Sequence, residues 1–374
     1  MKKTKIIIYS VLFLSLISLL TYLNYDKISN YFTNKEWEIA DSVGKINFDS
    51  YLGLESTNSN FIFIDNDEII GYSETAKKEF EHSMSSKDIE TYTTEDYMIL
   101  ADKDTGTIEV FSGKENIWTD TISNANILEV YINKNGYSAV IYAQTGYKSL
   151  IRVFSNTGEE LFTSFLPSSY AIDVAISTDN KTLAVAEVDT SGINVKSVIK
   201  FINIKDAAET GATTFNLEDG ELAVNIEFIA NNKFVVMTDK KVKLFDNNEF
   251  VTIVDFKTDD VLFASIDNLE NVVTVRRLKE GLFDSNVELC IYEYGDNEEL
   301  KKYELEEVPN AIHCFRKVTA VDVGNEIIFL NNSGNFMKKC EYNGQLKDLF
   351  VLGNENTAIL IFRNCAEFIK IGGI

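Results

Sequence analysis

The chain has 374 residues, of which 45% are hydrophobic, so it is long enough and apolar enough to form a large core. The formal net charge is −23, and such an acidic surface repels phosphate groups, which excludes nucleic acid and argues against docking on an anionic lipid face. With 25 Phe, 17 Tyr and only two Pro, the composition favours an ordered, strand-rich protein. We interpret the charge as a source of solubility; an acidic docking surface for a basic partner stays open as the alternative.

The N-terminal residues have the pattern of a membrane anchor. Lys2, Lys3 and Lys5 precede the uncharged run Ile6–Tyr25, which as a helix is about 30 Å long and matches one crossing of a bilayer. The positive-inside rule then predicts a cytoplasmic tail at residues 1–5 and an extracytoplasmic remainder. Small residues in the run are never spaced two apart, and no cysteine lies near it. This favours an uncleaved signal anchor at residues 6–25 over a cleaved signal peptide and excludes a lipoprotein anchor.

The segment after the anchor is polar with scattered aromatic side chains, and we interpret residues 26–44 as a short stalk. A repeated pattern then occupies residues 45–374. The expected organisation is a single-pass plasma membrane protein with a cytoplasmic N-terminus and one large extracytoplasmic domain.

The clearest copy of the repeat runs from Leu128 to Leu166. It contains four short apolar runs separated by turn residues. Asn135-Gly136 and Thr157-Gly158 supply the residues that adopt positive φ in tight hairpins. The segment therefore predicts a four-stranded antiparallel meander.

The second strand of this meander has counterparts along the whole domain, each a short run that is apolar on both faces. We assign these second strands to Phe61–Ile64, Tyr97–Ala101, Ala139–Tyr142, Leu183–Ala186, Phe234–Met237, Val272–Val275, Ile327–Leu330 and Ala358–Phe362. Their spacing is about 42 residues, which is typical of a propeller blade with four strands. Both prolines, Pro167 and Pro309, fall between units, where they break no ladder hydrogen bond.

The last unit has three strands before the chain ends, and Lys45–Phe48 is a strand-like run without a unit of its own. A fourth strand from the start of the domain would complete that unit and leave no exposed sheet edge. The expected fold is therefore all-β, an eight-bladed β-propeller behind one N-terminal transmembrane helix. Seven blades are the main alternative, and two tandem β-sandwiches remain a further one.

Few residues carry recognisable chemistry. His82 and His313 are the two histidines, and His313 and its neighbour Cys314 would point to opposite faces of a strand. Motifs for elbow serines, phosphate loops and zinc proteases are missing. Asp65–Glu68 and Asp102–Gly106 resemble calcium loops but lack the full pattern, so we interpret them as hairpin turns. We expect no enzyme, no catalytic residue, no cofactor and no metal.

The four cysteines lie near the C-terminus, at Cys290, Cys314, Cys340 and Cys365. Outside the cytoplasm an even number of cysteines is compatible with disulfides. Each lies among strand-like residues, which favours small buried side chains over bridges. The sequence leaves their redox state open.

One cluster indicates a partner-binding surface. The connections between second and third strands look enlarged at Gln144–Ser149, Glu187–Ser197 and Arg276–Val287. The third contains a basic and apolar group that is rare on this acidic chain, and we predict partner binding by Arg276, Arg277, Lys279 and Phe283. The alternative is a solvated loop with its apolar side chains folded back on the rim.

The run from Phe154 to Phe162, with Thr157-Gly158 at its centre, resembles the turn of quinoprotein-like propeller repeats, and Ala101–Gly106 is similar to part of the same motif. The whole layout resembles an uncharacterised family of membrane-anchored propellers from low-GC Gram-positive bacteria. This resemblance implies the fold and a place in the envelope, and related envelope propellers imply scaffolding.

The expected function is a non-catalytic interaction platform for an unidentified envelope or membrane protein. The alternative is a ligand-sensing, metal-sensing or enzymatic propeller that uses its central channel. The first strands of the units, which would line that channel, look mostly apolar or short and polar, which favours the platform.

Overall fold

The computed structural model describes residues 40–193, 195–207, 211–231, 233–246, 248–266, 271–277, 287–294, 299–305 and 307–372. The predicted tail at residues 1–5 and the anchor at 6–25 lie outside the described residues, as does the stalk up to residue 39. Within the described ranges, no helix combines the length and apolar character needed to cross a membrane.

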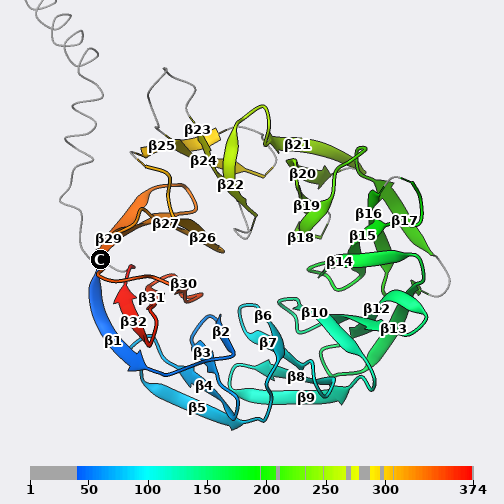
Figure 1. Cartoon of the computed structure of the whole chain (residues 1–374), viewed down its shortest axis with the longest axis horizontal. Coiled ribbons are helices and arrows are strands. Elements are labelled where there is room, and N and C mark those ends of the chain that lie inside the picture. Colours follow the sequence, from blue (N-terminus) through cyan, green and yellow to red (C-terminus); the bar gives the residue numbers. More distant parts are fainter. Residues whose placement is uncertain are drawn as a thin grey trace, which may run out of the picture. The chain divides into compact units, whose positions relative to one another are not determined.

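The described residues of the domain form eight antiparallel sheets of four strands each, arranged as the blades of a ring (Figure 1). In blades 1 to 7 the chain passes from the inner strand at the central channel to the outer strand at the circumference; in blade 8 the outer strand comes from the start of the domain. The prediction of an eight-bladed β-propeller is confirmed, and the alternatives of seven blades and of tandem sandwiches are wrong.

The first four blades follow one another along the chain. Blade 1 comprises β2 (Gly53–Ser56), β3 (Phe61–Ile64), β4 (Glu68–Tyr72) and β5 (Lys78–Ser83). Blade 2 comprises β6 (Ile89–Thr93), β7 (Tyr97–Asp102), β8 (Thr107–Ser112) and β9 (Glu115–Thr121). Blade 3 comprises β10 (Asn126–Ile132), β11 (Ser138–Gln144), β12 (Tyr147–Phe154) and β13 (Glu160–Leu166). Blade 4 comprises β14 (Ser169–Ile176), β15 (Thr182–Asp189), β16 (Lys196–Asn203) and β17 (Ala212–Asn216).

The remaining blades complete the ring. Blade 5 comprises β18 (Ala223–Ala230), β19 (Lys233–Thr238), β20 (Lys241–Asp246) and β21 (Glu249–Asp255). Blade 6 comprises β22 (Val261–Ser265), β23 (Asn271–Arg277), β24 (Val287–Glu293) and β25 (Glu299–Leu305). Blade 7 comprises β26 (Ala311–Phe315), β27 (Val318–Asp322), β28 (Glu326–Asn331) and β29 (Phe336–Glu341). Blade 8 comprises β30 (Asp348–Val351), β31 (Thr357–Ile361), β32 (Cys365–Lys370) and β1 (Asp41–Asn47).

Blade 8 joins the two ends of the domain. Its outer strand β1 pairs antiparallel with β32, with Ile46 opposite Ala366. The predicted contribution of Lys45–Phe48 is therefore confirmed, although the strand begins at Asp41 and takes in the last residues of the expected stalk. Because β32 is paired on both sides, it is not an exposed edge of its sheet.

The predicted second strands are confirmed in every blade except blade 7. There Ile327–Leu330 belongs to the third strand, β28, and the second strand is β27. Only two residues, Arg316 and Lys317, separate β26 from β27, and β27 is also apolar and fully buried. Two consecutive buried strands after a short turn cannot be ordered from their hydrophobic pattern alone.

The ring has two rims. The turn rim carries the turns from first to second and from third to fourth strands, and the link rim carries the turns from second to third strands and the links between blades. On the link rim, the expected enlarged loop Gln144–Ser149 is wrong, because β11 and β12 extend into it and meet in a tight turn at Gly146, whose φ is +98°. The loop between Glu187 and Ser197 is also shorter than expected, because β15 extends to Asp189 and β16 already begins at Lys196.

The core lies between adjacent blades. Large aromatic side chains are fully buried there, among them Phe61, Phe111, Phe154, Phe234, Phe329 and Phe368. Gly158, with φ of +81°, allows this close packing between blades, because a Cβ at this position would overlap the ring of Trp118 from blade 2. Cys290, Cys314 and Cys340 are buried and Cys365 is half-buried, and all four are free thiols. This agrees with small buried side chains rather than bridges.

Ring closure yields a stability prediction. Ile46 of β1 is 9% exposed and packs against Ile359 and Phe368. We expect Ile46→Ala to lower the free energy of unfolding by about 2 kcal/mol or more, because it leaves a cavity between the terminal strands. Urea denaturation measures the change. The exposed neighbour Lys45 provides the control, since Lys45→Ala should change stability by less than about 0.5 kcal/mol; equal losses in both variants would contradict this account.

Candidate functional site

The inner strands of the ring surround a central channel (Figure 1). None of the eight inner strands contains lysine or arginine, and His313 on β26 is the one base among them. Their acidic residues are Glu55, Glu90, Glu129, Asp173, Glu227 and Asp348. The expectation that these strands are mostly apolar or short and polar therefore missed an acidic residue on six of them.

Three of these carboxyl groups lie close together on blades 3, 4 and 5; Asp173 is buried, and Glu129 and Glu227 are half-buried. Asp173 accepts hydrogen bonds from the backbone amides of Val174 and Ile226, both at 2.7 Å, so its carboxylate joins β14 to β18. Burial, and then the nearby charge of Asp173, raise the pKa of Glu129. The same two causes raise the pKa of Glu227 to about 8.

Glu227 also makes contacts across the channel. Tyr131 of blade 3 donates a hydrogen bond to its Oε1 at 3.2 Å, and Tyr92 of blade 2 donates one to its Oε2 at 3.4 Å. The two tyrosine rings lie 5.0 Å apart. Because blades 2 and 5 are not neighbours in the ring, this group of three side chains narrows the channel between them.

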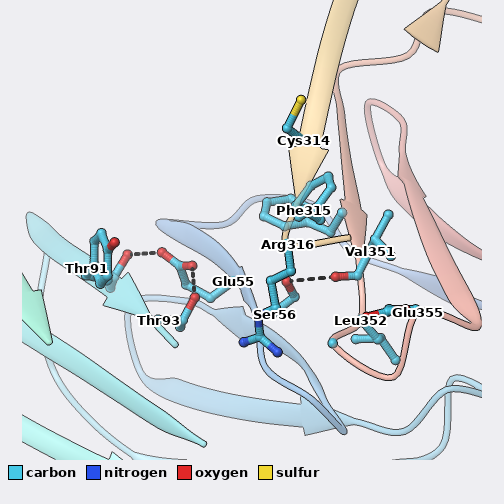
Figure 2. A pocket seen from close by; sticks show the side chains of 13 residues that line it. Glu55, Ser56, Thr91, Thr93, Cys314, Phe315, Arg316, Val351, Leu352 and Glu355 are labelled. Atoms are coloured by element: carbon cyan, nitrogen blue, oxygen red, sulfur yellow. Dashed lines mark hydrogen bonds between the residues drawn. The ribbon is translucent and has the colours of Figure 1, made fainter. Parts of the chain in front are cut away.

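Two cavities lie in the channel. One has a volume of about 250 Å³ and is lined by the Tyr92, Tyr131 and Glu227 group. The other, of about 270 Å³, lies between the inner strands of blades 1, 2, 7 and 8 (Figure 2). Both are lined by Tyr92, Thr93 and Arg316, so Arg316 stands where the two cavities meet.

Arg316 is a half-buried cation in a strained position. It lies in the short turn between β26 and β27 with φ of +46°, a region that bulky residues seldom occupy. Its Nη1 donates a hydrogen bond to Oδ1 of Asn58 on the far side of the cavity mouth. Burial lowers the pKa of the guanidinium, although the charges of Glu95 and Asp96 oppose this.

Glu55 faces the 270 Å³ cavity from β2 (Figure 2). The hydroxyl groups of Thr91 and Thr93 donate hydrogen bonds to its two carboxyl oxygens, at 2.6 and 2.9 Å. Burial is the largest cause of a raised pKa at Glu55; the hydroxyl hydrogen bonds act against it. The channel thus presents carboxyl groups, hydroxyls and one guanidinium, which is binding chemistry rather than an arrangement of nucleophile and base.

Other residues singled out in the sequence have structural roles. His313 lies 3.8 Å from Asp348, and His82 lies 3.5 Å from Glu109. In the Asp102–Gly106 turn, Asp102 Oδ1 accepts the amides of Asp104 and Thr105 at 2.9 and 3.1 Å, which supports the assignment as a hairpin turn. Among the residues described, no group of three or more His, Cys, Asp or Glu side chains could hold a metal ion.

The four residues predicted to bind a partner do not form one visible cluster. Arg276 lies in β23, where it donates to Glu288 Oε2 from Nε at 2.9 Å and from Nη2 at 2.7 Å. Its Nη1 donates to the hydroxyl of Tyr292 at 3.3 Å. Arg277 is exposed at the end of the same strand, and Lys279 and Phe283 lie outside the described residues. The guanidinium of Arg276 is therefore hydrogen-bonded to side chains of the neighbouring strand β24 in the same blade.

Exposed apolar side chains gather on the link rim of blades 3, 4 and 5. They lie at the starts of inner strands, in turns from second to third strands and at the end of an outer strand. We call them the apolar rim patch: Leu128, Tyr147, Phe165, Tyr170, Ile172, Val195, Leu222 and Val224. The sequence feature that could have indicated this patch lies in Ser169–Ile176, where apolar residues occur on both faces of an inner strand.

Comparisons with known proteins agree on the fold. The model of a family described as "Family of unknown function (DUF5711)" matches residues 24–371, and no curated protein matches the sequence. Sqt1 from Chaetomium thermophilum is similar in structure, with a TM-score of 0.56 and 10% identity over 89% of this chain and 99% of that one. The WD40 domain of SCAP from fission yeast is similar too, with a TM-score of 0.53 and 11% identity over 89% of this chain and 98% of that one. BamB from Moraxella catarrhalis has a TM-score of 0.51 and 12% identity over 89% of this chain and 100% of that one.

The buried channel carboxyls predict how stability depends on pH. Between the ordinary pKa of 4.5 and about 8, the folded chain holds a proton at Glu227 that the unfolded chain has lost, so the free energy of unfolding falls as pH rises through this window. Glu227→Gln keeps the shape of the side chain and removes its titration. We expect the loss of stability between about pH 5 and about pH 8 to shrink by about 1 kcal/mol or more.

Denaturation curves recorded across this pH range measure the effect. Glu115→Gln is the matched control, because Glu115 is an exposed residue of the outer strand β9. Parallel pH dependence in the wild-type and Glu227→Gln proteins would show that the Glu227 carboxyl is not held neutral.

Proposed function

We propose that this chain, which belongs to the family of unknown function DUF5711, is a non-catalytic protein-interaction platform anchored at the membrane surface of the cell envelope. The observation that carries the proposal is the apolar rim patch, because soluble domains seldom expose large apolar side chains together unless they bind something.

Contacts connect the apolar rim patch within blade 3 and from blade 3 to blade 4. The rings of Tyr147 and Phe165 lie 5.2 Å apart within blade 3. Lys148 bridges to blade 4, since its Nζ donates to the hydroxyl of Tyr170 at 2.9 Å and lies 4.9 Å from the centre of that ring. Tyrosines bordered by a lysine and aliphatic side chains supply the amphipathic contacts that protein interfaces favour. The partner we infer is therefore a protein with an apolar contact surface.

Hydrogen bonds join the blades that carry the patch, and a surface arranged in advance in this way lowers the entropic cost of binding. Asparagine side chains join neighbouring blades along the turn rim. Asn133 Nδ2 donates to Asn180 Oδ1 at 2.7 Å, and Asn135 Nδ2 donates to the carbonyl of Thr178 at 2.8 Å, both between blades 3 and 4. These bonds hold the blades that carry the patch in a constant arrangement.

The predicted basic segment belongs to the same proposal. Arg277 ends β23 on the link rim, the rim that also carries the apolar patch. We therefore retain Arg277, together with Lys279 and Phe283, as a second part of the partner-binding surface on blade 6. Arg276 serves mainly to position this end of the strand through Glu288.

The membrane part of the proposal is supported by the sequence. The uncharged run at residues 6–25 follows three lysines and has the length of one bilayer crossing. The first strand, β1, begins on the turn rim, so the chain joins the ring on the rim opposite the apolar patch.

Structural relatives support protein binding by this fold. Chaetomium thermophilum Sqt1 has been crystallised bound to the N-terminus of the ribosomal protein L10, and that structure has a TM-score of 0.54 and 10% identity to this chain. A propeller of this architecture can therefore present a surface to a protein segment.

Substitutions in the apolar rim patch test the proposal. We expect Phe165→Glu and Val224→Glu to reduce recovery of a specific partner from native membranes about tenfold or more, because a charge replaces an apolar contact at the interface. Both side chains are exposed, at 55% and 51%, so folding should be retained. Quantitative mass spectrometry of affinity-purified complexes provides the measurement.

Two further variants locate the surface. Val251→Glu is the control, since Val251 is 44% exposed on the outer strand β21 and lies away from the patch. Arg277→Glu tests the basic part on blade 6. Identical partner sets for wild type, Phe165→Glu and Val224→Glu would rule out the apolar rim patch as the docking surface.

The anchor has its own test. Deleting residues 6–25 should move the protein from the membrane fraction to the soluble fraction of the cells that produce it, because the deletion removes the one long uncharged run before the domain. Retention of the deleted protein on carbonate-washed membranes would contradict the anchor.

A further inference from the structure

The 270 Å³ cavity between blades 1, 2, 7 and 8 has the features of a small-molecule site (Figure 2). Its volume lies just below the roughly 300–1,000 Å³ of typical ligand clefts, which suits a small ligand. The rings of Phe315 and Phe350, 6.2 Å apart, form an apolar wall. Polar groups reach it from β2, β6 and the turn after β26.

Arg316 is the only lysine or arginine among the residues lining this cavity. A guanidinium has five N–H donors, and among the described residues it uses one of them on a protein acceptor, Asn58. The remaining donors suit a carboxylate, which binds guanidinium groups through two parallel hydrogen bonds.

The backbone conformation at Arg316 is strained. The turn holds a bulky residue at positive φ, where Gly, Asn or Asp is usual. Across the cavity mouth, Gly353 leaves room for the side chain, because a Cβ at this position would overlap both Arg316 Nη1 and Asn58. Two unusual positions therefore combine to place one guanidinium at the cavity.

Glu55 supplies the opposite chemistry on the same cavity. Thr91 and Thr93 hold its carboxyl group by hydrogen bonds. Among the described residues no lysine or arginine forms an ion pair with it, while Asp348 and Glu90 act on it with like charge. A carboxyl group in this setting lacks a cation, and an ammonium group would satisfy it.

These charges favour a ligand that carries both signs over a ligand of a single sign. A purely anionic ligand would meet repulsion from Glu355, which lines the cavity, and from the nearby Glu95 and Asp96. A purely cationic ligand would be repelled by Arg316. A molecule that carries both charges and an apolar group can satisfy Arg316, Glu55 and the phenylalanine wall together.

We propose that this cavity binds a small zwitterion with an apolar side chain, of the α-amino acid class, with its carboxylate at Arg316 and its ammonium group at Glu55. The site is separate from the link rim, so the proposal is independent of the protein-docking function.

Binding of leucine and its blocked analogues to the full-length chain tests the proposal. We expect leucine at millimolar concentrations to raise the melting temperature. N-acetyl-leucine, which lacks the ammonium group, and leucinamide, which lacks the carboxylate, should each bind about tenfold more weakly, because each loses one charge-assisted contact. Equal shifts with all three compounds, or no shift with leucine, would overturn the proposal without bearing on the rim patch.

Variants then assign each contact. Arg316→Gln should weaken leucine binding about tenfold and leave leucinamide binding unchanged, whereas Glu55→Gln should weaken leucine and leave N-acetyl-leucine unchanged. Arg363→Gln is the matched control, because Arg363 is exposed in the turn between β31 and β32. Leucine binding that is unaltered in Arg316→Gln would overturn the assignment, and far-ultraviolet circular dichroism verifies that each variant is folded.

Discussion

The structure depends on the pairing of β1 with β32, which closes the ring. Strands from the two ends of the domain share one sheet, so β32 is paired on both sides and is not left as an exposed edge. The buried phenylalanines between blades require the same closure, because each packs against a neighbouring sheet. Once the ring is closed, the inner strands are constrained to face one another around a narrow channel.

That constraint gives the channel its chemistry. An acidic residue on a single inner strand would be solvated, but ring closure brings Glu129, Asp173 and Glu227 close together and shields them partly from water. Burial then disfavours their charged forms, and the tyrosines of blades 2 and 3 supply hydrogen bonds across the channel. In the zwitterion site proposed above, the channel charges of Arg316 and Glu55 would contact the ligand.

The rims and the channel differ in how far the sequence could predict them. The basic cluster after Val275 is visible in the sequence, but the register that sets Arg276 opposite Glu288 is not, so the sequence could not show that this arginine is already paired. The apolar rim patch has the same origin. Its residues lie within ordinary strands or next to them, and their exposure depends on where each strand ends relative to its neighbours.

The repeat and the closing strand could be predicted from the sequence, and eight blades were favoured over seven, because hydrophobic patterns and turn residues act over short distances. The order of strands in blade 7 could not be predicted, since two buried strands follow one another there. The sites depend on contacts between distant parts of the chain. Tyr92 and Tyr131 lie 135 and 96 residues from Glu227 in the chain, and Arg316 lies 258 residues from Asn58. These groups come into contact because the ring closes, and a local sequence pattern cannot predict contacts between residues so far apart in the chain.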